Sequence, residues 1–214
     1  MEKLTLKPEA LFYLGKKMNG LYYNYDYYSA IPAVESDGGK KLLWHIESQM
    51  AEQGLLVEND DGDMVLADGV DGLLRPVFFG PFQAKVAFYP KAADDECYLF
   101  YFHWLEGDCR MITQTVEGFS VQRVTEEDLT ALAVSFMPES YLKKEAPSPD
   151  LKLDSDQITQ ILRAGSNSVG GEAKTLTAFN CDGWMCAETE EGKVDLLSPA
   201  DFVDRLMQII KEGE

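Results

Sequence analysis

Apolar and polar positions alternate most clearly in the middle of the chain. Residues 83–89 and 97–104 are rich in aromatic and β-branched residues and predict two strands. In the second strand the even positions 98–104 point to one face and the odd positions 99–103 to the other, and both sets are bulky. A strand that is apolar on both faces lies inside a sheet that is covered on both sides.

A period near 3.6 residues predicts helices elsewhere. The first begins at Pro8, whose fixed φ suits the first helical position, and ends at Asn19-Gly20. A second helix over residues 40–53 places its apolar side chains on one face and ends at Gly54. It is followed by a predicted hairpin, in which residues 55–57 and 64–66 flank an acidic turn.

Two segments of the chain repeat the same order of features. Residues 111–118 align without gaps to residues 185–192 and share Met, Thr, Glu and Gly. Each block is followed by a short predicted strand and then by a helix with a hydroxyl at the N-cap and a carboxylate three residues later, at Thr125 and Ser198. This recurrence predicts an internal duplication.

The openings of the two halves also match at their apolar positions, in residues 4–14 and 151–161. In the second opening, Asp154 and Gln157 form a capping-box pattern that predicts a helix ending at Gly165. Each half would then consist of an opening helix, an antiparallel meander and a closing helix.

The predicted fold is therefore α+β, with a pseudo-two-fold central antiparallel β-sheet flanked by helical bundles. The first half spans residues 1–146 and the second spans residues 147–214, and the two halves share one sheet. The Pro-Ser-Pro sequence within residues 144–150 resists both helix and strand, so this segment is the predicted linker.

Charge and composition narrow the classes of function. The 214 residues include 19 Lys and Arg against 37 Asp and Glu, a formal net charge of −18, which disfavours binding to nucleic acid or to an anionic membrane. The first residues lack the apolar core of a signal peptide, and no apolar run is long enough for a membrane span. We expect a cytoplasmic protein whose 4 cysteines are reduced thiols.

Catalytic motifs are not evident. The chain lacks a P-loop, a dinucleotide-type glycine fingerprint, HExxH and G-x-S-x-G. His103 and Cys109 flank one predicted turn, but proximity across a hairpin is a weak sign of a thiol–imidazole pair. The sequence predicts no enzyme, no metal site and no cofactor.

One anomaly of composition is a tyrosine cluster in residues 22–28, which holds five of the 10 tyrosines. Tyrosine is frequent in protein interfaces because it combines a rigid apolar ring with a hydroxyl. The alternative is a buried connection whose rings fill gaps in the core. The candidate partner-binding residues are Tyr22, Tyr23, Tyr25, Tyr27, Tyr28, Tyr101 and His103.

The order of these features is similar to that of the EspG family of type VII (ESX) secretion-associated chaperones. The likeness is carried by the opening helix, the helix that ends in Gln53-Gly54-Leu55-Leu56, the acidic turn, residues 72–76, and the ending from Phe179 through residues 192–200 to the last amphipathic helix. The resemblance implies a quasi-two-fold sheet protein that binds the helical tip of a secretion substrate in the cytosol. The chain departs from the family by being shorter and richer in Tyr, Lys and Glu.

We therefore expect a non-catalytic chaperone or adaptor that covers an apolar stripe on a secreted helical substrate of a type VII-like system. An acidic immunity-type inhibitor of a basic toxin is an alternative from another class. Salt distinguishes the two, because binding dominated by charge weakens more steeply with ionic strength than binding dominated by apolar burial. An uncharacterised α+β protein-interaction domain is the third possibility.

Overall fold

The structure is a computed structural model that describes residues 1–28, 37–92, 96–142, 155–168, 171–188 and 193–211. Its central feature is one nine-stranded sheet, in which every pair of neighbouring strands is antiparallel. The strands lie in the order β1 (Lys3–Leu6), β7 (Gly118–Val124), β6 (Asp108–Thr115), β5 (Tyr98–Leu105), β4 (Phe82–Tyr89), β8 (Ile158–Ser168), β9 (Thr175–Cys181), β10 (Trp184–Glu188) and β11 (Val194–Leu196).

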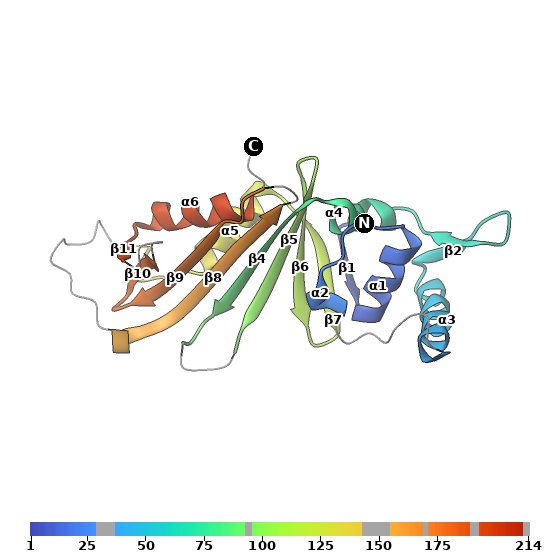
Figure 1. Ribbon diagram of the computed structural model, residues 1–214, viewed down its shortest axis with the longest axis horizontal. Coiled ribbons are helices and arrows are strands. Elements are labelled where there is room, and N and C mark those ends of the chain that lie inside the picture. Colours follow the sequence, from blue (N-terminus) through green and yellow to red (C-terminus); the bar gives the residue numbers. More distant parts are fainter. Residues whose placement is uncertain (29–36, 93–95, 143–154, 169–170, 189–192, 212–214) are drawn as a thin grey trace.

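Eight of the nine strands form two four-stranded meanders, β4 to β7 and β8 to β11, which meet where β4 pairs with β8 (Figure 1). The ninth strand, β1, pairs with β7 at the edge of the first meander. Each meander is followed by one helix, α5 (Glu126–Ser135) or α6 (Pro199–Ile210), and both helices begin with a capping box. The two blocks aligned by sequence begin on β6 and β10, the third strands of the two meanders, although residues 189–192 lie outside the described part. The predicted fold class is confirmed.

Two hydrophobic cores lie on opposite faces of the sheet. The first packs α5 and α6 against the meanders, and the indole Nε1 of Trp104 on β5 donates to the carbonyl of Ile210 at the end of α6 (2.8 Å). The second core lies beneath the helices that come before β4 in the chain. These helices are α1 (Pro8–Lys17), α2 (Tyr25–Tyr28), α3 (Asp37–Glu52) and α4 (Val70–Phe79).

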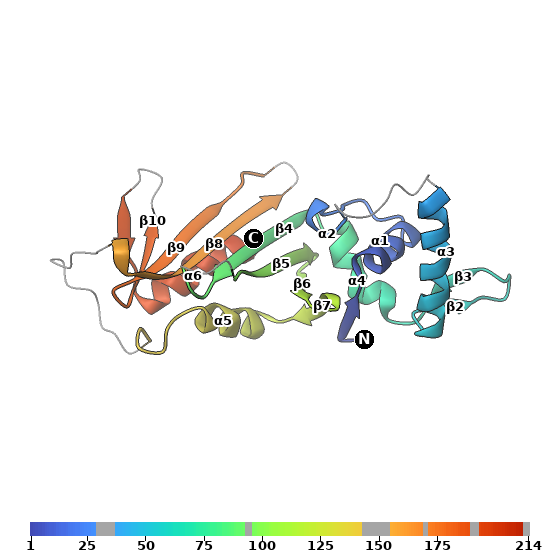
Figure 2. The ribbon, with the colours of Figure 1, turned by 90° about the horizontal axis from the view of Figure 1, so that it is seen from below.

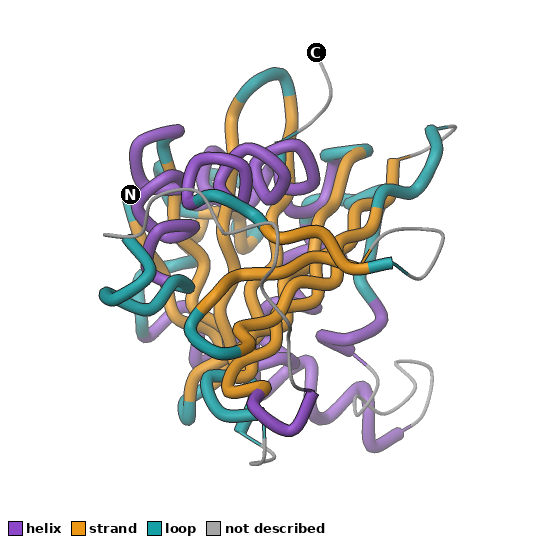
Figure 3. Tube along the Cα trace, turned by 90° about the vertical axis from the view of Figure 1, so that its left-hand side faces the viewer, coloured by secondary structure: helices purple, strands orange, loops and turns teal. Residues whose placement is uncertain are grey.

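Strand β5 is where the two cores overlap, since Phe102 belongs to the first core and Tyr101 to the second. This confirms the prediction of a strand buried on both faces. In Figures 1 and 2, α5 and the N-terminal helices lie on different sides of the strands, and the end-on view in Figure 3 also has helices on both sides. The cores are offset along the sheet, because α4 packs on β5, β6 and β7 whereas α6 packs on β4, β8 and β9.

The prediction of a helix that ends at Gly165 is wrong. Ser155–Gln157 form a single turn of 3-10 helix, and the chain then enters β8, the longest strand of the sheet. Leu162 and Ala164 are buried while Arg163 between them is exposed, which is the period of a strand. The capping-box pattern involves only a few neighbouring residues, whereas pairing with both β4 and β9 provides backbone hydrogen bonds along the whole strand.

Helix α4 was not predicted, because Gly72 and Pro76 disfavour a helix interior. Pro76 has no N–H to donate to the carbonyl of Gly72, four residues earlier. The guanidinium of Arg110 on β6 takes that place: its Nη2 donates to the Gly72 carbonyl (2.8 Å) and its Nε to the Leu73 carbonyl (2.8 Å). A strand residue therefore supplies the hydrogen bond that proline removes.

The predicted hairpin is confirmed as a separate two-stranded sheet of β2 (Leu56–Glu58) and β3 (Met64–Leu66). The side chain of Asn59 caps its turn by accepting from the N–H groups of Asp61 and Asp63. Figure 1 shows this hairpin projecting beyond α3 at the end of the molecule. The predicted linker and the boundary at residues 146 and 147 lie outside the described residues.

Candidate functional site

The sheet has one face that the described helices leave uncovered. On β4, β8 and β9 the side chains that point toward α6, such as Val86, Leu162 and Ala178, are buried. Apart from the buried Cys181 at the end of β9, the described side chains on the other face are half-buried or exposed, and none belongs to either core. The name open face is used here for the paired residues at the centre of this face, which are Lys85, Ala87, Tyr89, Ile161, Arg163, Gly165, Thr175, Thr177 and Phe179.

Strand register arranges the open face in rows that cross the three strands. Tyr89, Ile161 and Phe179 lie opposite one another and form an apolar row. The next row contains Arg163 between two smaller residues on the neighbouring strands. Cross-strand neighbours on one face are close enough for their side chains to act as one surface. The open face thus combines an apolar row with a polar region.

The charge of the open face is opposite to that of the whole protein. Strands β4, β8 and β9 contain only two charged residues, Lys85 and Arg163, and both are basic, whereas the chain carries a net charge of −18. Arg163 is exposed. A basic and apolar surface on an acidic protein fits a partner with apolar and acidic side chains.

Helix α2 borders the open face. Lys85 Nζ donates to Asp26 Oδ2 on α2 (2.6 Å), and this contact lowers the pKa of the Asp26 carboxyl. The hydroxyl of Tyr101 also donates to Asp26 (3.2 Å). The ion pair partly satisfies Lys85, so Arg163 is the more available cation for a partner.

Three of the predicted partner-binding residues are buried where α2 packs against β5. Tyr27, Tyr101 and His103 are at most 3% exposed, and the Tyr27 hydroxyl lies 2.8 Å from His103 Nε2. The ring of Tyr27 makes an edge contact with that of Tyr101, with centroids 4.9 Å apart. Burial lowers the pKa of His103 to about 3, so the imidazole is neutral. In this conformation these side chains fill the core, which matches the alternative interpretation of the cluster.

The other tyrosines of the cluster are placed differently. Tyr22 is half-exposed, while Tyr23 packs between Phe12 and Phe78 with ring centroids 6.0 and 5.7 Å away. Tyr25 and Tyr28 lie on α2, and their side chains fall outside the described part of the structure. The structure thus brings Tyr27, Tyr101 and His103 together and leaves Tyr22 at the surface.

Sequence reasoning missed the open face itself. Its key residues, Ile161 and Arg163, lie in the segment that was predicted as a helix. The signal was present as an alternation in which Arg163 is flanked by small or apolar residues. A strand interpretation of residues 158–168 would have placed both side chains on one face.

Cysteine chemistry has little support in the described residues. His103 points into the core beneath α2, and Cys109 points into the core beneath α5 and α6, so the two do not form a thiol–imidazole pair. Burial raises the pKa of the Cys109 and Cys186 thiols to about 12, which suppresses the nucleophilic thiolate. No group of three potential metal ligands occurs among the described residues.

None of the helices that the structure describes is both long enough and apolar enough to cross a bilayer.

Comparison with known proteins gives a likeness of fold. No protein-family model matches the chain, and no curated protein matches its sequence. The chain is similar to a solved structure of the Mycobacterium tuberculosis type VII secretion system chaperone EspG5 in complex with a PE25-PPE41 dimer. The two share 11% sequence identity with a TM-score of 0.61, over 99% of this chain and 98% of that chain. The full-length overlap establishes a common fold.

Proposed function

We propose that this protein is a non-catalytic cytoplasmic chaperone or adaptor that binds a helical substrate of a type VII-like secretion system. The observation that carries the proposal is the likeness of fold to EspG5 over the whole length of both chains. That protein is a secretion chaperone in complex with a PE25-PPE41 dimer. The residues described above have no arrangement typical of catalysis, which favours a binding role.

The open face is the proposed docking surface. Its apolar row of Tyr89, Ile161 and Phe179 offers area for an apolar stripe on a helical partner. Arg163 beside that row offers a partner for an acidic side chain on the same helix. Covering the stripe would keep the partner from self-association before export, and the net charge of −18 would keep the complex in solution.

The proposal is tested by co-expression with small helical proteins encoded beside a type VII secretion ATPase in the same genome. We expect one of them to move from the insoluble to the soluble fraction and to co-purify with the chain. The combined substitution Phe179→Ser and Arg163→Glu should weaken this capture by about tenfold or more, because it removes apolar area and inverts the charge.

Matched controls lie far from the open face, on α3 and on the β2–β3 hairpin (Figure 1). Lys41→Glu on α3 and Val57→Ser on β2 also change one exposed cation and one exposed apolar side chain, and they should leave capture unchanged. Tyr22→Ser tests the half-exposed tyrosine of the cluster. The proposal fails if every candidate substrate is equally soluble without the chain, or if the open-face variant captures as well as the controls.

Salt titration of the captured complex separates this proposal from toxin inhibition. Binding through the apolar row should weaken only slightly between low and physiological salt. An inhibitor that uses the acidic surface against a basic toxin would lose affinity steeply over the same range.

A further inference from the structure

Strand β1 leaves one edge of the sheet open, at the far end from the open face (Figure 1). Among the described residues it pairs only with β7. The N–H of Arg123 donates to the carbonyl of Glu2 (3.1 Å), and hydrogen bonding in an antiparallel ladder alternates, so Leu4 and Leu6 also bond to β7. The backbone N–H and C=O groups of Lys3 and Thr5 therefore point away from the sheet.

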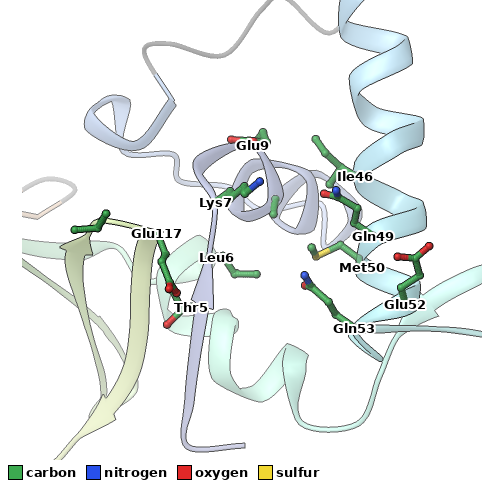
Figure 4. A pocket seen from close by; sticks show the side chains of 12 residues that line it. Thr5, Leu6, Lys7, Glu9, Ile46, Gln49, Met50, Glu52, Gln53 and Glu117 are labelled. Carbon is green, nitrogen blue, oxygen red and sulfur yellow. The ribbon is translucent and has the colours of Figure 1, made fainter.

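A groove of ≈ 520 Å³ lies at this edge, between β1, the start of α1, α3 and the turn that joins β6 to β7 (Figure 4). Its floor is apolar and consists of side chains that are at most 3% exposed, those of Leu6, Ala10, Ile46 and Met50. This volume lies in the range of ordinary binding pockets. The groove thus places an apolar floor beside backbone groups that pair with no described strand.

The rim of the groove is acidic. Glu9, Glu52 and Glu117 line it together with a single cation, Lys7. Glu52 and Glu117 are exposed and come from different elements, α3 and the β6–β7 turn, so they flank the groove from two sides in Figure 4. A segment with positive side chains complements this rim.

We propose that the groove binds a short extended segment of a partner protein, in which basic residues alternate with apolar ones, as an added strand on β1. Strand addition to an open edge uses backbone hydrogen bonds for affinity and pockets for alternate side chains for selectivity. Apolar side chains of the segment would face Leu6, Ile46 and Met50, and its basic side chains would reach Glu52 and Glu117. The outward backbone groups of Lys3 and Thr5, which no described strand pairs, would bond to the segment.

This site is separate from the proposed docking surface for a helical substrate. The groove is built from β1, α1 and α3, whereas the open face is built from β4, β8 and β9. Variants at either site should therefore leave binding at the other unchanged. Failure of one proposal is distinguishable from failure of the other.

The test uses a short fluorescent peptide in which lysine alternates with valine, titrated with the full chain and followed by anisotropy. We expect saturable binding that weakens with salt. Thr5→Pro should abolish most of it, because proline removes the outward N–H while Leu4 and Leu6 retain the bonds to β7. The double substitution Glu52→Lys and Glu117→Lys should weaken binding by about tenfold or more.

Glu127→Lys on α5 is the matched control, since it inverts an exposed carboxylate away from the groove. Circular dichroism and thermal unfolding verify that each variant is folded. If Thr5→Pro does not fold, the double substitution Glu52→Lys and Glu117→Lys still tests the proposal. A peptide with glutamate in place of lysine should bind at least about tenfold more weakly.

Three results would overturn the proposal. The peptide does not saturate the chain, or it binds the groove variants as tightly as the control. Alternatively, sedimentation shows that the chain alone forms a dimer that Thr5→Pro dissociates, in which case a second copy occupies the edge.

Discussion

At the scale of single residues, Arg110 has the most consequential environment. Its side chain is 3% exposed, and its guanidinium bonds to Asp108 as well as to the carbonyls of Gly72 and Leu73. Arg110 and Arg123 together lower the pKa of the Asp108 carboxyl well below its usual range. Arg110 thus fastens α4 to β6 and compensates for Pro76 at the same time.

The compensation can be measured with a double-mutant cycle. Arg110→Met should destabilise the protein by about 2–4 kcal/mol, because buried carbonyls lose their donors. Pro76→Ala should be more favourable by about 1 kcal/mol in the Arg110→Met background than in the parent, because the restored N–H then bonds to the Gly72 carbonyl. Urea unfolding of the four proteins gives the coupling, and additive effects would disprove the link.

His103 makes stability depend on pH. Burial lowers its pKa in the folded state to about 3 from an ordinary value of 6.5, so below pH 6.5 the unfolded chain binds a proton that the folded chain does not. Unfolding should therefore become easier by about 1.4 kcal/mol between pH 7.5 and 5.5.

Urea unfolding at both pH values measures this change. The variant His103→Gln is expected to be less stable at pH 7.5, and the change in its stability between the two values should shrink by that amount. An unaltered pH dependence in this variant would show that other groups cause it.

At the scale of elements, the sequence was sufficient to predict a helix or strand wherever buried positions recur with a regular period. The two capped helices, the second predicted helix, the hairpin and β5 all follow from local patterns that the tertiary structure keeps. β8 and α4 did not follow, because their stabilising partners lie elsewhere in the chain: β4 and β9 for β8, and Arg110 for α4. The open face depends on β8, so it was missed with that strand.

Close approach of strands β1 and β7 requires a glycine at Gly118. Its φ is +140°, and a Cβ there would lie 2.2 Å from the carbonyl oxygen of Leu6 on β1. Gly118→Ala should cost more than about 2 kcal/mol and detach β1 from β7, which hydrogen exchange at Leu4 and Leu6 would detect.

Gly107 is the matched control for this substitution. It also has a positive φ, +79°, but apart from Gly107 and its two chain neighbours no described heavy atom lies within 4 Å of the position that a Cβ would take. Gly107→Ala should therefore cost only the backbone strain, about 1 kcal/mol, without any change in exchange on β1. Equal effects of the two substitutions would contradict the close approach.

At the scale of the whole molecule, the pair of β4 and β8 joins the two meanders into one unit. Eight residues of each strand are in register, and the first core is continuous across the pair through Val86 and Leu162. α5 and α6 pack against each other above this junction. The two halves should therefore unfold together.

Leu162→Ala tests this cooperativity. The side chain is 1% exposed, so its truncation should cost about 3 kcal/mol. Native-state hydrogen exchange should report the same loss of protection in β6 and in β9, although only β9 neighbours the substitution. Val57→Ala on the separate hairpin should leave both strands unchanged, and a loss confined to β8 and β9 would indicate two independent units.

The antiparallel junction of two like meanders has an evolutionary consequence. A half-length ancestor with one meander and one closing helix would have assembled as a symmetric homodimer about the same junction. Such a dimer would present two identical surfaces, one on each half. With N-terminal helices covering one of those surfaces, as they cover the first meander in this chain, a fused protein of this kind would recruit one ligand molecule per polypeptide.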